Sequence, residues 1–249
     1  MQKLKKYSKT LNPKFIRTIS ASSALIPPDA QKIISKIAAL FLTTFLLQTC
    51  LPEQTLAEGQ GYISRKYLQN PLYRESLALI EAKDYKSAIK KLSIFLEKNE
   101  SSHEGYFFRG KSYHELNVLD KASADYTKAI KLNPSYDKAH NNRGLIYGQL
   151  RRFDLAMNSF TKAIEINPQL KEAYNNRGVA RAATGDKKNA IKDFTKSIEL
   201  DKSYIEPRLN RSFVLEMEGE LNKACEDWKI ASRMGSRDAR VWLKAQCNK

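Results

Sequence analysis

The stretch "HNNRG" at residues 140–144 returns as "YNNRG" at residues 174–178, 34 residues further along the chain. Steps of 34 residues also bring five alanines into register, and a large apolar residue stands four positions after each of them. A period of this length, kept over five copies, predicts an array of structural repeats. The alanines are Ala88, Ala122, Ala156, Ala190 and Ala224, and the large residues are Leu92, Tyr126, Phe160, Phe194 and Trp228.

A unit of 34 residues is long enough for two helices of about 12–14 residues that are joined by tight turns, as in an αα-hairpin. The dipeptides "NP" at 133–134 and 167–168 predict the end of the second helix, because the residue before a proline avoids the α region. A column of small residues stands twelve positions before the alanines. Glycine inside a helix costs about 1 kcal/mol, so we interpret this column as the place where the two helices approach closely. The column consists of Ser76, Gly110, Gly144, Gly178 and Ser212.

This spacing resembles the tetratricopeptide repeat (TPR), whose pattern is W-x2-L-G-x2-Y…A-x3-F…P. The resemblance covers about two thirds of the chain, as five repeats over residues 69–238. It implies an all-α solenoid of antiparallel helix hairpins in a right-handed superhelix. The "SRDARVWLKAQC" segment after the last repeat suggests a cap helix over residues 239–249. The repeats are 69–102, 103–136, 137–170, 171–204 and 205–238.

TPR proteins bind peptides on the concave face that their first helices form, and the resemblance implies which residues line that groove here. The asparagines interest us most, because a primary amide can donate to and accept from a peptide backbone without reading side chains. A column of Asn142, Asn176 and Asn210 is the centre of this hypothesis. The alternative is that these amides serve hydrogen bonds between helices. The predicted groove residues are Asn141, Asn142, Asn175, Asn176, Asn210, Phe107, Lys111 and Phe213.

A second column holds arginine where the family usually has leucine: Arg109, Arg143, Arg177 and Arg211. An arginine stem can cover apolar surface while its guanidinium reaches a carboxylate. One interpretation is recognition of an acidic peptide or a C-terminal carboxylate. The other is an internal contact with an acid of a neighbouring helix, such as Glu165 or Glu199.

The chain has three cysteines, and none of their spacings matches a zinc site or a Cys-x-x-Cys motif. Cys225 lies in the last repeat and Cys247 in the predicted cap helix, whereas Cys50 precedes the repeats. In an oxidising compartment Cys225 and Cys247 could form a disulfide that holds the cap; the alternative is two small buried thiols.

We expect no metal, no cofactor and no enzyme activity. The histidines His103, His114 and His140 fall at unrelated repeat positions without clustered carboxylates. No pairing of a nucleophile with a base, no glycine-rich phosphate loop and no paired carboxylates stand out from the repeat pattern.

Residues 1–57 form a basic leader that holds eight Lys or Arg and two acids, within a chain of net charge +16. Its segment 37–51 begins with the apolar run "IAALFLTTFLL", which is shorter than the roughly 20 residues of a bilayer span. Three interpretations stay open: an export signal cleaved before Glu58, an uncleaved signal anchor, and a bipartite organelle address. Residues 58–68 then form a linker. We expect an exported or membrane-anchored protein, in a periplasm, thylakoid lumen or similar compartment, or else one targeted to an organelle.

Together these features predict a scaffold that binds a protein or peptide partner and assists assembly of a membrane-associated or exported complex. Membrane contact would come from the N-terminal segment. The alternatives are a basic helical-repeat RNA-binding protein and a structural subunit of a membrane complex. We do not expect a nucleic-acid partner, because the predicted groove residues are mainly asparagine and apolar rather than basic.

Overall fold

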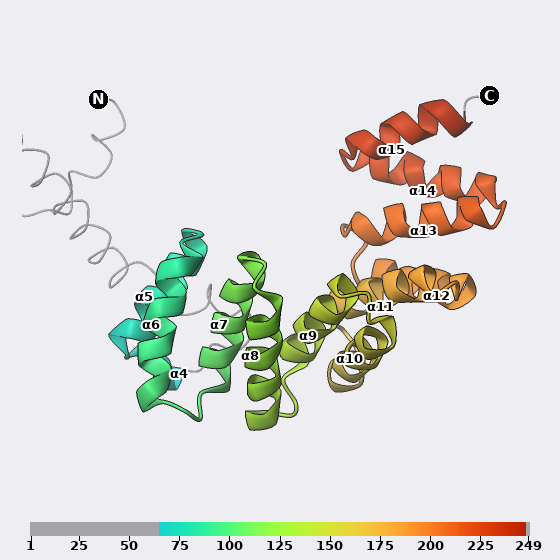
Figure 1. Ribbon diagram of the computed structural model, residues 1–249. Coiled ribbons are helices and arrows are strands. Elements are labelled where there is room, and N and C mark those ends of the chain that lie inside the picture. The colour runs from blue at the N-terminus through green and yellow to red at the C-terminus, as the bar shows by residue number, and fades with distance from the viewer. Residues whose placement is uncertain (1–64, 248–249) are drawn as a thin grey trace, which may run out of the picture. The chain divides into compact units, whose positions relative to one another are not determined.

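The computed structural model describes residues 65–247, which form a series of paired antiparallel helices (Figure 1). The first helices of the pairs, here called A helices, are α5 (Pro71–Glu81), α7 (His103–Glu115), α9 (Asp137–Gln149), α11 (Lys171–Ala183) and α13 (Glu206–Met217). The second helices, the B helices, are α6 (Tyr85–Lys98), α8 (Leu119–Leu132), α10 (Phe153–Ile166), α12 (Lys187–Leu200) and α14 (Leu221–Arg233). A short helix, α4 (Arg65–Leu68), precedes the pairs. Since residues 65–247 contain no β-strand, the prediction of an all-α solenoid of helix hairpins is confirmed.

Consecutive hairpins stack so that each B helix packs between its own A helix and the A helix of the next hairpin. The A helices also contact one another in succession, from α5 through α7, α9 and α11 to α13. They therefore share one face of the stack, which we call the A face. We call the opposite face, formed by the B helices, the B face.

In the second, third and fourth hairpins, the glycine of the A helix lies where the aromatic ring of its B helix packs. A Cβ atom added to Gly144 would lie 2.5 Å from Cε1 of Phe160, and one added to Gly178 would lie 2.7 Å from Cε1 of Phe194. Both rings are almost fully buried. Phe160 also clusters with Ala180 of the next A helix, so one ring fills the space between two hairpins. The predicted packing role of the glycine column is confirmed.

The turn between the A and B helices uses the same backbone conformation in all five hairpins. One residue adopts a positive φ, at Lys83 (60°), Asn117 (57°), Arg151 (57°), Gly185 (86°) and Gly219 (79°). Glycine occupies this position in the last two hairpins only. The other three turns hold an L-residue in the left-handed region, which is unfavourable for every residue except glycine and, to a lesser extent, asparagine.

The stack ends in α15 (Arg237–Trp242) and a π-helical turn, η2 (Leu243–Cys247), which pack on α14. Ala239 is fully buried there, and the Trp242 ring lies 4.5 Å from the Phe213 ring, centroid to centroid. Cys225 of α14 and Cys247 form a disulfide, with their Cα atoms 5.8 Å apart. The C-terminal segment is therefore held to the last hairpin both by packing and by a covalent bond.

The leader 1–57, its apolar segment 37–51 with Cys50, and most of the linker 58–68 lie outside the described residues. Among the helices of residues 65–247, none combines the length and the apolar character needed to cross a bilayer.

Candidate binding surfaces on the repeats

Five asparagines on α9, α11 and α13 form a continuous chain of side-chain hydrogen bonds. Between helices, Asn210 donates to Asn175 (2.9 Å) and Asn176 donates to Asn141 (3.0 Å). Within helices, Asn175 donates to Asn176 (3.5 Å) and Asn141 donates to Asn142 (3.3 Å). We call this set the asparagine chain. The asparagine chain joins three successive A helices through their amides. This agrees with the alternative interpretation, in which these amides form hydrogen bonds between helices.

The asparagine chain ends on the hydroxyl of Tyr126 in α8, to which Asn142 donates at 3.4 Å. Burial raises the pKa of Tyr126 far above its ordinary value, so this hydroxyl stays neutral at every physiological pH. Each hydrogen bond between helices in this set is donated by one repeat to the repeat that precedes it.

Burial separates the asparagines into two groups. Asn141 and Asn175 are only 7% and 6% exposed, so their predicted role as peptide contacts is wrong. They face the next hairpin and accept its hydrogen bond. Asn142, Asn176 and Asn210 are half-buried. A primary amide has two donor hydrogens and two lone pairs. Each of these three residues therefore keeps donors or acceptors that the hydrogen bonds of the asparagine chain do not use.

The other predicted groove residues also divide by burial. Phe107 is 6% exposed and packs against the rings of Tyr126 and Tyr136, with centroid distances of 5.8 and 4.9 Å, so its predicted peptide contact is wrong. Phe107 occupies the same repeat position as Asn141, and both side chains are buried. Lys111 is half-buried on α7, and Phe213 is 36% exposed on α13.

Three apolar side chains of the last two A helices are open to solvent. Val179 of α11 is 45% exposed, Phe213 of α13 is 36% exposed and Met217 of α13 is 67% exposed. Val179 and Phe213 follow Asn176 and Asn210 by three residues, and residues three apart on a helix are neighbours. We call these three residues the apolar strip. It lies beside the half-buried amides on the A face.

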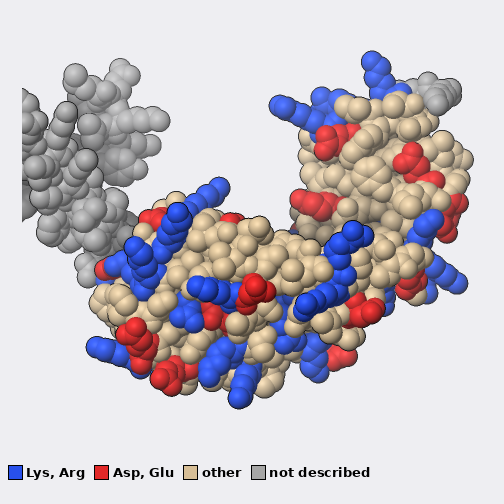
Figure 2. All heavy atoms as spheres, viewed as in Figure 1, with Lys and Arg blue, Asp and Glu red and all other residues tan. Residues whose placement is uncertain are grey.

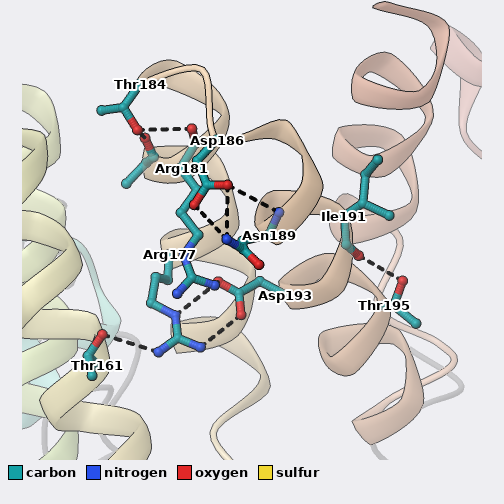
Figure 3. Close-up of polar contacts among 10 residues, drawn as sticks. Thr161, Arg177, Arg181, Thr184, Asp186, Asn189, Ile191, Asp193 and Thr195 are labelled. Atoms are coloured by element: carbon teal, nitrogen blue, oxygen red, sulfur yellow. Dashed lines mark hydrogen bonds and ion pairs between the residues drawn. The ribbon is translucent and has the colours of Figure 1, made fainter. Parts of the chain in front are cut away.

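Three of the four arginines in the second column are paired inside the protein. Each makes two hydrogen bonds of 2.7–2.9 Å to an aspartate sixteen residues later, on the B helix of its own hairpin. Each also donates to a hydroxyl on the preceding B helix, as Figure 3 shows for Arg177 between Asp193 and Thr161. The three groups are Ser93–Arg109–Asp125, Thr161–Arg177–Asp193 and Thr195–Arg211–Asp227.

The predicted recognition of an external carboxylate is therefore wrong for Arg109, Arg177 and Arg211, whose guanidinium groups lie between two B helices. The internal alternative is right in kind, but the acids it named are wrong. Glu165 and Glu199 pair with lysines three residues away on the exposed surface. An aspartate sixteen positions after the arginine was the signal in the sequence that would have identified the correct partners.

Arg143 is the exception in this column. The residue sixteen positions later is Ser159, not aspartate. Nε of Arg143 is buried without a hydrogen-bond partner among the described residues. Its guanidinium lies 5.9 Å from the centre of the Tyr147 ring.

Within residues 65–247, no three His, Cys, Asp or Glu side chains gather in a way that could hold a metal ion. His140, which sequence analysis left without a role, is buried and hydrogen-bonded through Nε2 to the carbonyl of Pro134 at 3.0 Å. Burial lowers the pKa of His140, so the ring is neutral near pH 7.

Hairpins of this kind, stacked at a period of 34 residues, define a helical-repeat scaffold protein. The chain contains tetratricopeptide repeats. A TPR repeat family model matches residues 110–151, and tetratricopeptide repeat models match residues 137–170 and 171–204. No curated protein sequence matches the chain.

Similar solved structures share this fold. MamA of Desulfovibrio magneticus RS-1 is 18% identical with a TM-score of 0.60, over 72% of this chain and 96% of that one. PilF of Pseudomonas aeruginosa is 19% identical with a TM-score of 0.63, over 68% of this chain and 77% of that one. YrrB, described as a TPR protein with an unusual peptide-binding site, is 19% identical with a TM-score of 0.58, over 73% of this chain and 94% of that one. At these identities the likeness concerns the fold alone.

Proposed function

We propose that the A face binds an extended peptide or a partner helix of another protein, and that the chain acts as a non-enzymatic scaffold. TPR proteins bind protein or peptide partners and are generally non-enzymatic. The observation that carries the proposal is the apolar strip of Val179, Phe213 and Met217 beside the half-buried amides.

The two features supply different parts of the binding energy. Full burial of a Val, Phe or Met side chain contributes about 1.5–3 kcal/mol, so the half-exposed apolar strip can contribute a few kcal/mol in all. The unused amide donors and acceptors of Asn142, Asn176 and Asn210 can form hydrogen bonds with the backbone of a bound segment. These bonds would replace the ones that the backbone loses with water on binding. Apolar side chains would then set the affinity, and the amides would hold the backbone in register.

We further propose that the chain works beyond a membrane or at its surface, where it assists assembly of a membrane-associated or exported complex. The disulfide between Cys225 and Cys247 supports this, because such bonds persist in oxidising compartments and are rare in the cytosol. The leader, with its apolar run after a basic segment, fits export or anchoring. Sequencing the N-terminus of the purified protein tests this part: Glu58 as first residue supports cleavage after export, and an intact leader supports an anchor.

The experiment for the A face compares two matched substitutions in a tagged pull-down from membranes. Val179→Ser removes an apolar side chain from the apolar strip, where it is 45% exposed, and Ile94→Ser removes one from B helix α6, where it is 48% exposed. We expect Val179→Ser, and more strongly Phe213→Ser, to reduce recovery of specific partners while Ile94→Ser leaves it unchanged. Loss of partners with Ile94→Ser alone would instead favour a structural subunit that uses its B face.

The same samples test the RNA-binding alternative. A basic RNA-binding array releases counterions, so its affinity falls steeply with salt concentration. We expect partner recovery to survive nuclease treatment and to change little between low and moderate salt. Recovery that is abolished by nuclease would contradict the proposed function.

A further inference from the structure

The third hairpin contains a binding slot on its B side that the neighbouring hairpins fill with their own aspartates. In the second, fourth and fifth hairpins an arginine lies between a hydroxyl of the preceding B helix and an aspartate of its own B helix. The third hairpin keeps the arginine, Arg143, and the preceding hydroxyl residue, Thr127. Only the acid is missing, because Ser159 takes its place.

Arg143 therefore lacks the anion that balances the equivalent arginine in the other three hairpins. Its Nε is buried and makes no hydrogen bond within residues 65–247, and neither Thr127 nor Ser159 bonds to it. Ser159 is 3% exposed, so the position of the missing acid is itself buried. A buried donor without a partner is destabilising, and more so when it is charged. This unmet donor would favour any ligand that brings a planar pair of oxygens.

A cavity of about 520 Å³ opens beside this slot, between α8 and the junction of α9 with α10. Thr127 and Tyr147 line it, and these are the slot's hydroxyl residue and the ring nearest to Arg143. Three cationic residues and one acid also line the cavity: Lys128, Lys131, Arg152 and Asp120. Figure 2 shows several Lys and Arg side chains over this part of the stack. The lining of the cavity is thus net positive. Arg143 does not itself line the cavity, but its guanidinium lies 5.9 Å from the centre of the Tyr147 ring, which does.

We propose that this cavity binds a carboxylate from an acidic segment of a protein partner, with Arg143 as the bidentate contact and Lys128, Lys131 and Arg152 as supporting cations. A carboxylate fits better than a phosphate, because aspartate carboxylates fill the equivalent slot in three neighbouring hairpins with two hydrogen bonds each. The fork of a guanidinium matches two carboxylate oxygens in the same plane. This site is distinct from the apolar strip and gives the scaffold a second point of contact.

Ser159 allows a direct test, because Ser159→Asp should supply the missing acid from within the chain. The probe is a fluorescein-labelled hexaglutamate peptide, and binding to the full-length chain is followed by fluorescence anisotropy at low salt. We expect Ser159→Asp to weaken binding by about tenfold or more, as Arg143 becomes paired internally. The matched neutral variant Ser159→Asn should bind within about twofold of the unsubstituted chain.

Two further variants separate this site from general charge attraction. Arg143→Leu, which places the usual family residue in the column, should also weaken hexaglutamate binding about tenfold. Lys188→Gln removes one charge from an exposed position of α12 and should change binding less than twofold. Val179→Ser should leave hexaglutamate binding intact, so failure of this site and failure of the proposed A-face function are distinguishable.

Thermal melting by circular dichroism checks that each variant is folded, and we expect Ser159→Asp to melt above the unsubstituted chain. If Ser159→Asp does not fold, Arg143→Leu decides alone. Unchanged hexaglutamate binding in Arg143→Leu would overturn the proposal, and so would equal losses in Arg143→Leu and Lys188→Gln. Competition by inorganic phosphate, but not by acetate at equal ionic strength, would overturn the assignment to a carboxylate.

Discussion

Arg109 and Asp125 form a two-bonded salt bridge, with both N–O distances at 2.8 Å, across the two helices of one hairpin. Asp125 is 6% exposed, and hydrogen bonding to it raises the pKa of Arg109. Arg143 occupies the equivalent position one repeat later, without an acid. The two arginines therefore occupy the same repeat position, but only Arg109 is paired with a carboxylate.

Substitution of these two arginines by leucine should have opposite consequences for stability. Arg109→Leu leaves the buried carboxylate of Asp125 unpaired, and we expect a loss of about 3 kcal/mol of unfolding free energy. Arg143→Leu removes a buried donor that has no partner, so we expect a change near zero or a gain of about 1 kcal/mol. Urea unfolding followed by circular dichroism measures both. Equal losses in the two variants would contradict the pairing seen here.

The asparagine chain predicts that position within it determines the cost of a substitution. Asn176 accepts from Asn175 and donates to Asn141, so Asn176→Ala leaves a buried donor and a buried acceptor unpaired. We expect a loss of about 2 kcal/mol of unfolding free energy. Asn210 is the last member of the asparagine chain and only donates, to Asn175. Asn210→Ala should therefore cost about 1 kcal/mol of unfolding free energy. A larger loss for Asn210→Ala in urea unfolding would contradict this order.

The turns with positive φ predict a stabilising substitution. Lys83 adopts a φ of 60° in the first A–B turn, where glycine stands in the last two repeats. Lys83→Gly should raise the unfolding free energy by about 1 kcal/mol, because the left-handed conformation costs an L-residue about that much. Asn117→Gly, at the equivalent turn with a φ of 57°, should gain less, since asparagine tolerates this conformation. Thermal melts of the two variants against the unsubstituted chain show the difference.

His140 predicts that stability falls in mild acid. Burial lowers its pKa below the ordinary value of 6.5, so the folded chain binds this proton less readily than the unfolded chain. The contribution of neutral His140 is present above pH 6.5 and is lost as pH falls through the lower pKa of the folded state. His140→Gln keeps a donor for the Pro134 carbonyl but does not titrate. Its urea midpoint should therefore fall less between pH 7.5 and pH 5 than that of the unsubstituted chain.

Reduction of the disulfide should release the C-terminal cap. Cys225 and Cys247 are 22 residues apart, and a bridge over a loop of this size contributes roughly 3 kcal/mol in the chain-entropy account. We expect a reducing agent to lower the melting temperature of the unsubstituted chain but not that of the Cys225→Ser/Cys247→Ser double variant. Mass spectrometry without reduction checks the bond directly, and two free thiols in the mature protein would contradict it.

Periodicity was enough to predict the hairpins, because residues such as Gly144 and Phe160 recur at the spacing that their contact requires. The partners of the arginines were not predicted, although Asp125, Asp193 and Asp227 recur at the same period as the arginines. The sequence alone does not show how far each helix is rotated about its axis. Adjacent residues on a helix differ by about 100° in direction, so Asn141 turns inwards while Asn142 reaches the surface.

The direction of the asparagine chain makes the array extensible. Each Asn-Asn pair accepts a hydrogen bond from the repeat that follows and passes one to the repeat that precedes. A duplicated copy of residues 171–204, inserted after residue 204, would accept from Asn210 and donate to Asn175, so both junctions would be complete without any other substitution. The repeat is in this sense a module with a donor end and an acceptor end. The number of repeats in the array could therefore change, in evolution or by design, while the stacking interface stays the same.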